Sequence, residues 1–253
     1  MTEVLLQRRD RTAVITLNVP DRRNAITLPI SARLAELVAE CERDEDVAAL
    51  VVTGAPPAFC AGADLTALGA AREEGLRAIY AGFLAVARCT LPTIAAVGGA
   101  AVGAGLNLAL ACDVRLAGPR AKFDARFLQL GIHPGGGMTW MLQRVVGPQT
   151  AAAMTLFGTT LDATEAVRTG LALRAVDGDH DALVDAAVEL AAPAGKAPRE
   201  LVTATKRTLR TTATYDRHDD AVETELVAQV ASMDTPAFAE LLAAMRARIS
   251  RDA

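Results

Sequence analysis

Residues 94–113 decide the fold of this chain, and they read Ile-Ala-Ala-Val-Gly-Gly-Ala-Ala-Val-Gly-Ala-Gly-Leu-Asn-Leu-Ala-Leu-Ala-Cys-Asp. The segment begins as an apolar run of strand length, passes through small residues and continues with the composition of a helix. Residues 93–112 are uncharged and long enough to cross a bilayer. Four glycines interrupt them, at positions 98, 99, 103 and 105. The pattern therefore predicts a buried strand, a glycine turn and a buried helix, and no membrane span.

A second segment, Ala58-Phe59-Cys60-Ala61-Gly62-Ala63-Asp64-Leu65, has the same order of features after an apolar run at residues 48–53. Backbone N–H groups at a helix start lack an intrahelical acceptor and attract negative charge. Small residues let a ligand approach them closely. Two such starts that face one point would form an oxyanion hole from the main chain, although either segment alone is better explained as a tight turn.

Strands and helices alternate over the first half of the chain. Strands are expected at residues 4–8, 12–17, 48–53, 93–97 and 114–117, and helices at 28–44, 64–88 and 103–112. This alternation is typical of an α/β fold with a parallel sheet and helical crossovers. From about residue 139 onward one strand is expected at 173–176, and helices at 142–146, 150–157, 163–169, 182–192, 198–215, 221–233 and 236–249.

We therefore predict a β/α core over residues 1–195 and a helical C-terminal region over residues 196–253. The apolar residues of segment 221–249 exceed what one small helical hairpin can bury. This excess favours packing on another subunit, although packing on the chain's own core is equally compatible with the sequence.

The composition excludes several classes of protein. Of the 253 residues 51% are apolar but only 4% are aromatic, so the core is built mainly from Ala, Val, Leu and Ile. The net charge is −4 without a basic stripe, which argues against a nucleic-acid partner. Residues 1–10 hold no apolar leader. Four scattered cysteines without a C-x-x-C pair predict reduced, buried thiols in a cytoplasmic protein (Cys41, Cys60, Cys89 and Cys112).

Common catalytic motifs are missing from the sequence. None of the three serines lies in G-x-S-x-G, and there is no H-E-x-x-H zinc motif. A dinucleotide-binding G-x-G-x-x-G fails because Leu108 stands at the third glycine and no acidic residue follows about twenty residues on. An NAD-dependent oxidoreductase is therefore a disfavoured alternative, and we expect no metal.

Taken together, the two glycine-bearing segments resemble the enoyl-CoA hydratase/isomerase (crotonase) family. The stretches Leu-Asn-Val-Pro-Asp-Arg-Arg-Asn-Ala at 17–25, Cys-Asp-Val-Arg at 112–115 and Leu-Gly-Ile-His-Pro-Gly-Gly-Gly at 130–137 extend the resemblance over roughly residues 4–215. It implies a crotonase-like spiral of ββα repeats and a helical C-terminal trimerisation region in a homotrimer or hexamer. It further implies an acyl-CoA substrate of fatty acid metabolism, a lyase or isomerase reaction, and no cofactor beyond the CoA moiety.

The resemblance also assigns roles to residues. The N–H groups of Ala61 and Ala104 would form the oxyanion hole. The CoA path would be lined by Arg22, Arg23, Ala25, Ala63, Asp64 and Gly103. The two arginines would meet the phosphates, unless they are a solvated charge pair, and the side chain of Asp64 is better explained as a helix N-cap.

Two departures from the family pattern concern its catalytic acids. The positions where hydratases of this family carry glutamates hold Asn107 and Phe127. Neither side chain transfers a proton at neutral pH, so simple hydration is doubtful. A non-catalytic acyl-CoA-binding protein is the main alternative. His133 is the remaining candidate proton carrier, or else a turn residue. Phe127 and Trp140 would make the acyl pocket apolar, or belong to the core.

Overall fold

The computed structural model describes residues 2–66 and 72–252. The chain divides into two compact units, Met1–Gly195 and Lys196–Ala253. Within the described residues no helix is both long enough and apolar enough to span a membrane.

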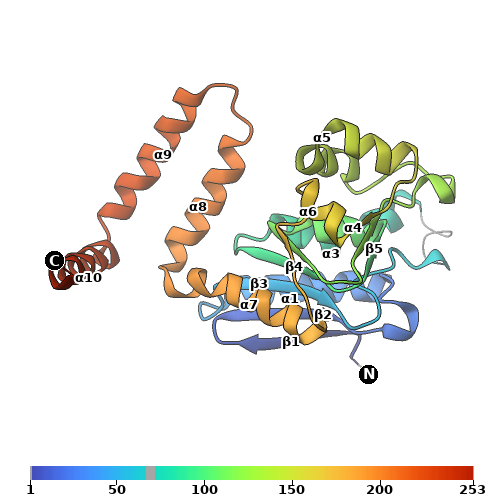
Figure 1. Ribbon diagram of the computed structural model, residues 1–253, viewed down its shortest axis with the longest axis horizontal. Coiled ribbons are helices and arrows are strands. Elements are labelled where there is room, and N and C mark those ends of the chain that lie inside the picture. The colour runs from blue at the N-terminus through green and yellow to red at the C-terminus, as the bar shows by residue number, and fades with distance from the viewer. Residues whose placement is uncertain (1, 67–71, 253) are drawn as a thin grey trace. The chain divides into compact units, whose positions relative to one another are not determined.

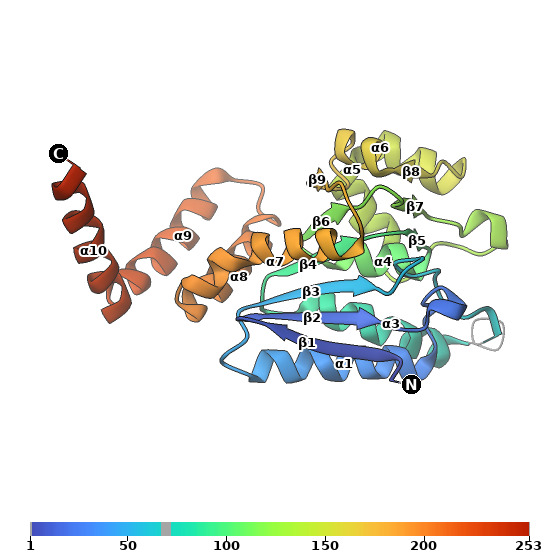
Figure 2. The ribbon, with the colours of Figure 1, turned by 60° about the horizontal axis from the view of Figure 1, so that its bottom comes forward.

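The main sheet of the first unit has the strand order β1-β2-β3-β4-β6-β9 (Figure 2). Its strands are β1 (Val4–Arg9), β2 (Thr12–Leu17), β3 (Ala49–Gly54), β4 (Thr93–Val97), β6 (Val114–Ala117) and β9 (Arg174–Ala175). The β1–β2 hairpin is antiparallel, whereas β2–β3, β3–β4, β4–β6 and β6–β9 are parallel pairs. Strands β3 and β4 are buried throughout, as expected for continuous apolar runs covered on both faces.

Helices cover both faces of this sheet. One face packs against α1 (Leu28–Arg43), α3 (Glu73–Arg88) and α4 (Ala104–Ala111), and the other packs against α7 (His180–Lys196). Alternate residues of β3 divide between the two layers, since Leu50 belongs to the first and Val51 to the second. Both faces are thus closed, and only the strand ends and their loops are left for a ligand.

Three short strands, β5 (Ala100–Val102), β7 (Lys122–Asp124) and β8 (Leu161–Asp162), form a second sheet. The sequence analysis missed them, because two or three residues carry no periodic signal. Strand β5 pairs with β7 in parallel, with Val102 beside Asp124. Strand β5 lies between β4 and α4 in the chain, so its pairing with β7 positions the start of that helix.

Other expected elements differ in detail. The expected helix at 64–88 is helical at residues 65–66 and again over α3, and residues 67–71 lie outside the described residues. Helix α5 (Met138–Leu156) contains the expected break as a kink at Gly147, whose φ of 75° is not helical, just before Pro148. The helix α6 (Ala163–Arg168) and the short turns η1 (Pro20–Arg22) and η2 (Leu128–Leu130) complete the unit.

The second unit holds the helices α8 (Arg199–Thr212), α9 (His218–Met233) and α10 (Pro236–Asp252). Helices α8 and α9 contact each other as a hairpin (Figure 1). Large apolar side chains stay exposed along these helices, among them Leu209 and Val227, the latter 73% exposed.

Candidate active site

The two glycine-bearing turns lie next to each other in the structure. Cys60 donates its N–H to the carbonyl of Ala100 at 3.0 Å and accepts from the N–H of Val102 at 2.9 Å. A Cβ on Gly62, whose φ is 104°, would lie 2.9 Å from the carbonyl oxygen of Val102 and 3.9 Å from the nitrogen of Ala104. Segments some forty residues apart in the sequence therefore meet at the start of α4.

The start of α4 presents unused backbone donors. Gly103 precedes the helix with a φ of 52° and gives its own N–H to the carbonyl of Asp124 at 2.9 Å. The first intrahelical hydrogen bond runs from the N–H of Asn107 to the carbonyl of Gly103 at 3.0 Å, and no side chain among the described residues caps this end. The N–H of Ala104 therefore has no acceptor within its helix, and it lies at the end that carries partial positive charge.

The expectation for Ala61 is contradicted by its hydrogen bonding. Its N–H donates to the carbonyl of Arg23 at 2.9 Å, so this donor is already used within the chain. Neighbouring Ala63 sits in a parallel bridge with Ile26. Ile26 donates to the carbonyl of Gly62 at 2.7 Å and accepts from Asp64 at 2.9 Å.

In a parallel bridge of this kind, the residue between the two bonded neighbours turns its own N–H and C=O to the opposite side. The N–H of Ala63 therefore points away from Ile26, and it donates no hydrogen bond within the described part of the chain. Within the described residues, the N–H groups of Ala63 and Ala104 are thus both left without an acceptor. Sequence spacing could not distinguish Ala61 from Ala63, because the difference depends on which residue pairs with Ile26.

Asn24 holds the loop beside this turn, and the sequence analysis missed it. Its side chain is buried, accepts from the N–H of Val19 at 2.9 Å and donates to the carbonyls of Ala55 and Ala58, both at 2.8 Å. Its φ of 58° lies in the left-handed region, which Asn tolerates better than most residues. An asparagine in a loop between two apolar runs was the available signal.

The expected CoA-binding residues lie around this loop. Arg22 and Arg23 are exposed, and Arg22 forms an ion pair with Glu3 at 2.7 Å. Ala25 is half-buried. The carboxylate of Asp64 accepts the N–H of Thr66 at 3.0 Å, as expected for a helix N-cap.

The two positions of the missing glutamates both lie near the core. Asn107 is 1% exposed, and its Nδ2 donates to the carbonyl of Gly135 at 3.0 Å. Its Oδ1 is buried without a hydrogen-bond partner in residues 2–66 and 72–252. Phe127 is half-buried and packs against the main core. Neither residue brings a carboxylate to the start of α4.

His133 and Trp140 lie at the surface. The ring of His133 is exposed, with Nδ1 at 2.7 Å from the carbonyl of Pro134. Trp140 is 59% exposed, and the guanidinium of Arg144 lies 3.9 Å from its ring centre. Trp140 was expected to line an acyl pocket, but the described chain alone does not enclose its side chain.

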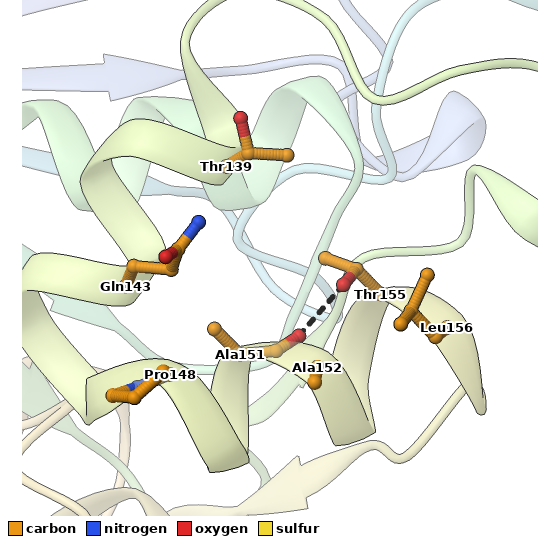
Figure 3. Close-up of a pocket in the computed structure, with 7 residues that line it drawn as sticks. All are labelled: Thr139, Gln143, Pro148, Ala151, Ala152, Thr155 and Leu156. Carbon is orange, nitrogen blue, oxygen red and sulfur yellow. Dashed lines mark hydrogen bonds between the residues drawn. The ribbon is translucent and has the colours of Figure 1, made fainter.

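A shallow pocket lies along the kinked helix α5 (Figure 3). Thr155 donates from Oγ1 to the carbonyl of Ala151 at 2.7 Å inside it. None of the residues that line this pocket is titratable, so none of them could transfer a proton to or from a ligand. Its lining residues are Thr139, Gln143, Pro148, Ala151, Ala152, Thr155 and Leu156.

The thiol of Cys60 near the two turns is not a reactive group, and the described residues form no cluster of metal ligands. Burial raises the pKa of the Cys60 thiol to about 12, so it is a neutral packing group and not a nucleophile. Burial also raises the pKa of Cys41, to about 11. In the part of the chain that the structure describes, no three His, Cys, Asp or Glu side chains cluster as metal ligands would.

Comparisons with known proteins agree with this architecture. A sequence model described as enoyl-CoA hydratase/isomerase matches residues 7–244. A probable enoyl-CoA hydratase of Mycobacterium tuberculosis is 56% identical over 254 residues, which cover 97% of this chain and 98% of that protein. The 1,2-epoxyphenylacetyl-CoA isomerase of Escherichia coli is 36% identical over 200 residues, 76% of each protein. A crystal structure of enoyl-CoA hydratase from Bacillus anthracis matches with a TM-score of 0.90 at 27% identity, covering 98% of this chain and 97% of its own.

Proposed function

We propose, from the premise that this chain belongs to the enoyl-CoA hydratase/isomerase family and has its crotonase-like fold, that it binds an acyl-CoA thioester and polarises the thioester carbonyl. The groups that would do so are the backbone N–H groups of Ala104 and Ala63. The observation that carries the proposal is the close approach of the turn at residues 61–64 to the start of α4. A Cβ added to Gly62 would lie 3.9 Å from the nitrogen of Ala104.

The physical case rests on preorganised donors. Two N–H groups fixed by a helix start and a strand bridge need not reorganise when negative charge develops on the carbonyl oxygen. Removing one such donor typically lowers turnover roughly 10²–10³-fold. The burial of Ala104, which is 8% exposed, excludes most of the water that would weaken the interaction.

The CoA moiety would follow the loop at residues 22–25 and the turn at 61–64. Main-chain groups of Ala25 and Gly103 would line its path, and the exposed guanidinium groups of Arg22 and Arg23 would meet its phosphates. The carboxylate of Asp64 would contribute by capping the following helix, because its charge has the same sign as the phosphates. No cofactor beyond the CoA moiety is required.

The reaction would be a lyase or isomerase step that passes through an enolate-like state. Polarising the carbonyl acidifies the neighbouring carbon, while Asn107 and Phe127 leave ordinary hydration without its two acids. The proton would then be carried by His133 or by the substrate itself. Binding without turnover would instead identify a non-catalytic acyl-CoA carrier.

Assembly into a homotrimer or hexamer belongs to the same proposal. The exposed apolar side chains of α9, such as Leu226 and Val227, would be covered by other copies of the chain. The four cysteines are buried thiols that form no disulfide, which supports a reducing, cytoplasmic environment.

Calorimetry with a matched ligand pair tests the proposed hole. Butyryl-CoA carries the thioester carbonyl, and S-butyl-CoA is the thioether that lacks only this oxygen. We expect butyryl-CoA to bind about tenfold more tightly, which corresponds to roughly 1.4 kcal/mol. Failure of every acyl-CoA to bind would overturn the proposed function, and equal binding of the pair would overturn the oxyanion hole.

A proline variant removes the donor itself. Ala104→Pro deletes the N–H at the first helical position, where proline is tolerated. It should abolish the preference for butyryl-CoA while S-butyl-CoA still binds. Ala163→Pro is the matched control, because it places proline at the first position of α6 and should leave the preference intact.

A further inference from the structure

We infer that Asn107 selects acyl groups that carry an O–H donor near the thioester carbonyl, an inference that rests on the proposed function. Asn107 is almost wholly buried, and within the described residues its Oδ1 accepts no hydrogen bond. Leaving a buried amide oxygen without a donor is costly. A ligand that brings a donor to this oxygen removes that cost.

The orientation of the Asn107 amide is set by its other end. Its Nδ2 donates to the carbonyl of Gly135, which can only accept. Turning the amide over would place two oxygens against each other. A Cβ added to Gly136 would lie only 2.8 Å from Nδ2, so Gly136 also lies close to the Nδ2 side of the amide. Oδ1 therefore faces away from residues 135–136.

The side chain of Asn107 leans toward the proposed carbonyl site. Asn107 lies three residues after Ala104, so both lie on one face of α4 about 4.5 Å apart along the axis. Helical side chains point back toward the N-terminus of their helix. This direction places Oδ1 toward the Ala104 end of α4, the side on which the first carbons after the proposed carbonyl would lie.

Within the described residues no neighbouring donor bonds Oδ1, and the hydroxyl of Tyr80, which lies beside Gly135, does not do so either. The ring of Phe83 lies beside Gly136, with Cζ 2.5 Å from the Cβ position of that glycine, and it is apolar. Phe127, in place of a glutamate, has no donor either. The donor that fits is an O–H group, which a hydroxyl on the acyl chain or a water molecule could supply. The geometry points to the acyl hydroxyl, that is, to 2- or 3-hydroxyacyl thioesters.

Calorimetry on the intact protein separates these two sources. The probes are 2-hydroxybutyryl-CoA, 3-hydroxybutyryl-CoA and butyryl-CoA, which differ only in the hydroxyl. We expect one hydroxylated probe to bind at least about fivefold more tightly than butyryl-CoA, the effect of one added hydrogen bond. Equal affinities would overturn the inference and assign the donor to water. If none of the three binds, the proposed function itself fails.

Two variants tie the preference to Oδ1. Asn107→Leu keeps the size but removes the acceptor, and should reduce the ratio of affinities to about one. Gln143→Leu, which also replaces an amide by leucine but on α5, should leave the ratio unchanged. If Asn107→Leu does not fold, Asn107→Asp decides. It keeps an acceptor oxygen but not the amide donor to Gly135, so a surviving preference supports the acceptor role and a lost one contradicts it.

Discussion

Arg115 donates a hydrogen bond from Nη1 to the carbonyl of Cys112 at 2.7 Å, at the opposite end of α4 from Ala104. The same guanidinium donates from Nε to the carbonyl of Leu171 at 2.6 Å. A helix C-terminus carries partial negative charge and unsatisfied carbonyls. The buried arginine donates hydrogen bonds to these carbonyls and so holds the C-terminal end of α4. The N-terminus of this helix carries the proposed donor Ala104.

Replacing Arg115 by methionine should therefore destabilise the fold. Arg115→Met leaves buried carbonyls without donors, and we expect the free energy of unfolding to fall by about 2–4 kcal/mol. Urea denaturation measures this loss. Arg33→Met is the control, since Arg33 forms surface ion pairs with Glu36 and Glu40, and it should cost no more than about 1 kcal/mol. Equal losses in both variants would contradict the role of Arg115.

Hydration of crotonyl-CoA should be slow. With Asn107 and Phe127 at the acid positions, turnover should stay far below the roughly 10 s⁻¹ of an average enzyme. The double change Asn107→Glu with Phe127→Glu should raise it if the backbone donors are in place. Loss of absorbance by the enoyl thioester follows the reaction, and Gln143→Glu controls for an added carboxylate elsewhere. Fast turnover by the unchanged protein would show that another group supplies the proton.

His133 is tested separately with the protein's own substrate. The contact of Nδ1 with the carbonyl of Pro134 fits a proton on Nδ1, which leaves Nε2 able to act as a base. His133→Gln should reduce turnover by about 10²-fold without changing thioester affinity. If turnover is unaltered, His133 is a turn residue and the proton passes through the substrate.

His180 should make stability depend on pH. Burial lowers the pKa of its imidazole, against the opposing effects of Asp181 and Asp179, while Arg120 lowers it further. The unfolded chain, with an ordinary value near 6.5, then binds the proton more readily than the folded chain. Stability is full above about pH 6.5 and falls as the pH drops toward the folded-state pKa.

His180→Gln should flatten this loss. The difference in melting temperature between the protein and the variant, followed from pH 7.5 to pH 5, measures it. His218→Gln replaces an exposed histidine and should follow the unchanged protein. A variant at position 180 with the full acid sensitivity would assign the loss to other groups.

The second unit should mediate self-association. We expect three or six chains by light scattering at micromolar concentration, and Val227→Glu should shift the protein toward monomer because it places a charge in the apolar contact. Gln229→Glu adds the same charge at a polar position of α9 and should not. A monomeric mass for the unchanged protein would refute the assembly.

The sequence predicted the large elements because each carries its own signal. Strands such as β3 are continuous apolar runs, and helices such as α1 show their period within one segment. The second sheet escaped prediction because β5 and β7 are stable only through pairing with each other. The choice of Ala61 failed for a similar reason. The pairing of Ile26 with Ala63, which joins two distant segments, decides that the N–H of Ala63 and not that of Ala61 is left without an acceptor in the described residues.

Because both proposed donors are main-chain atoms, every amino acid except proline would supply them. Point mutation can thus alter the neighbouring side chains without erasing thioester activation. The Asn and Phe at positions 107 and 127 fit this view. Mutation can replace the side chains that transfer protons, whereas it leaves the backbone donors that polarise the carbonyl in place. New activities can then arise by single substitutions around a hole that stays the same.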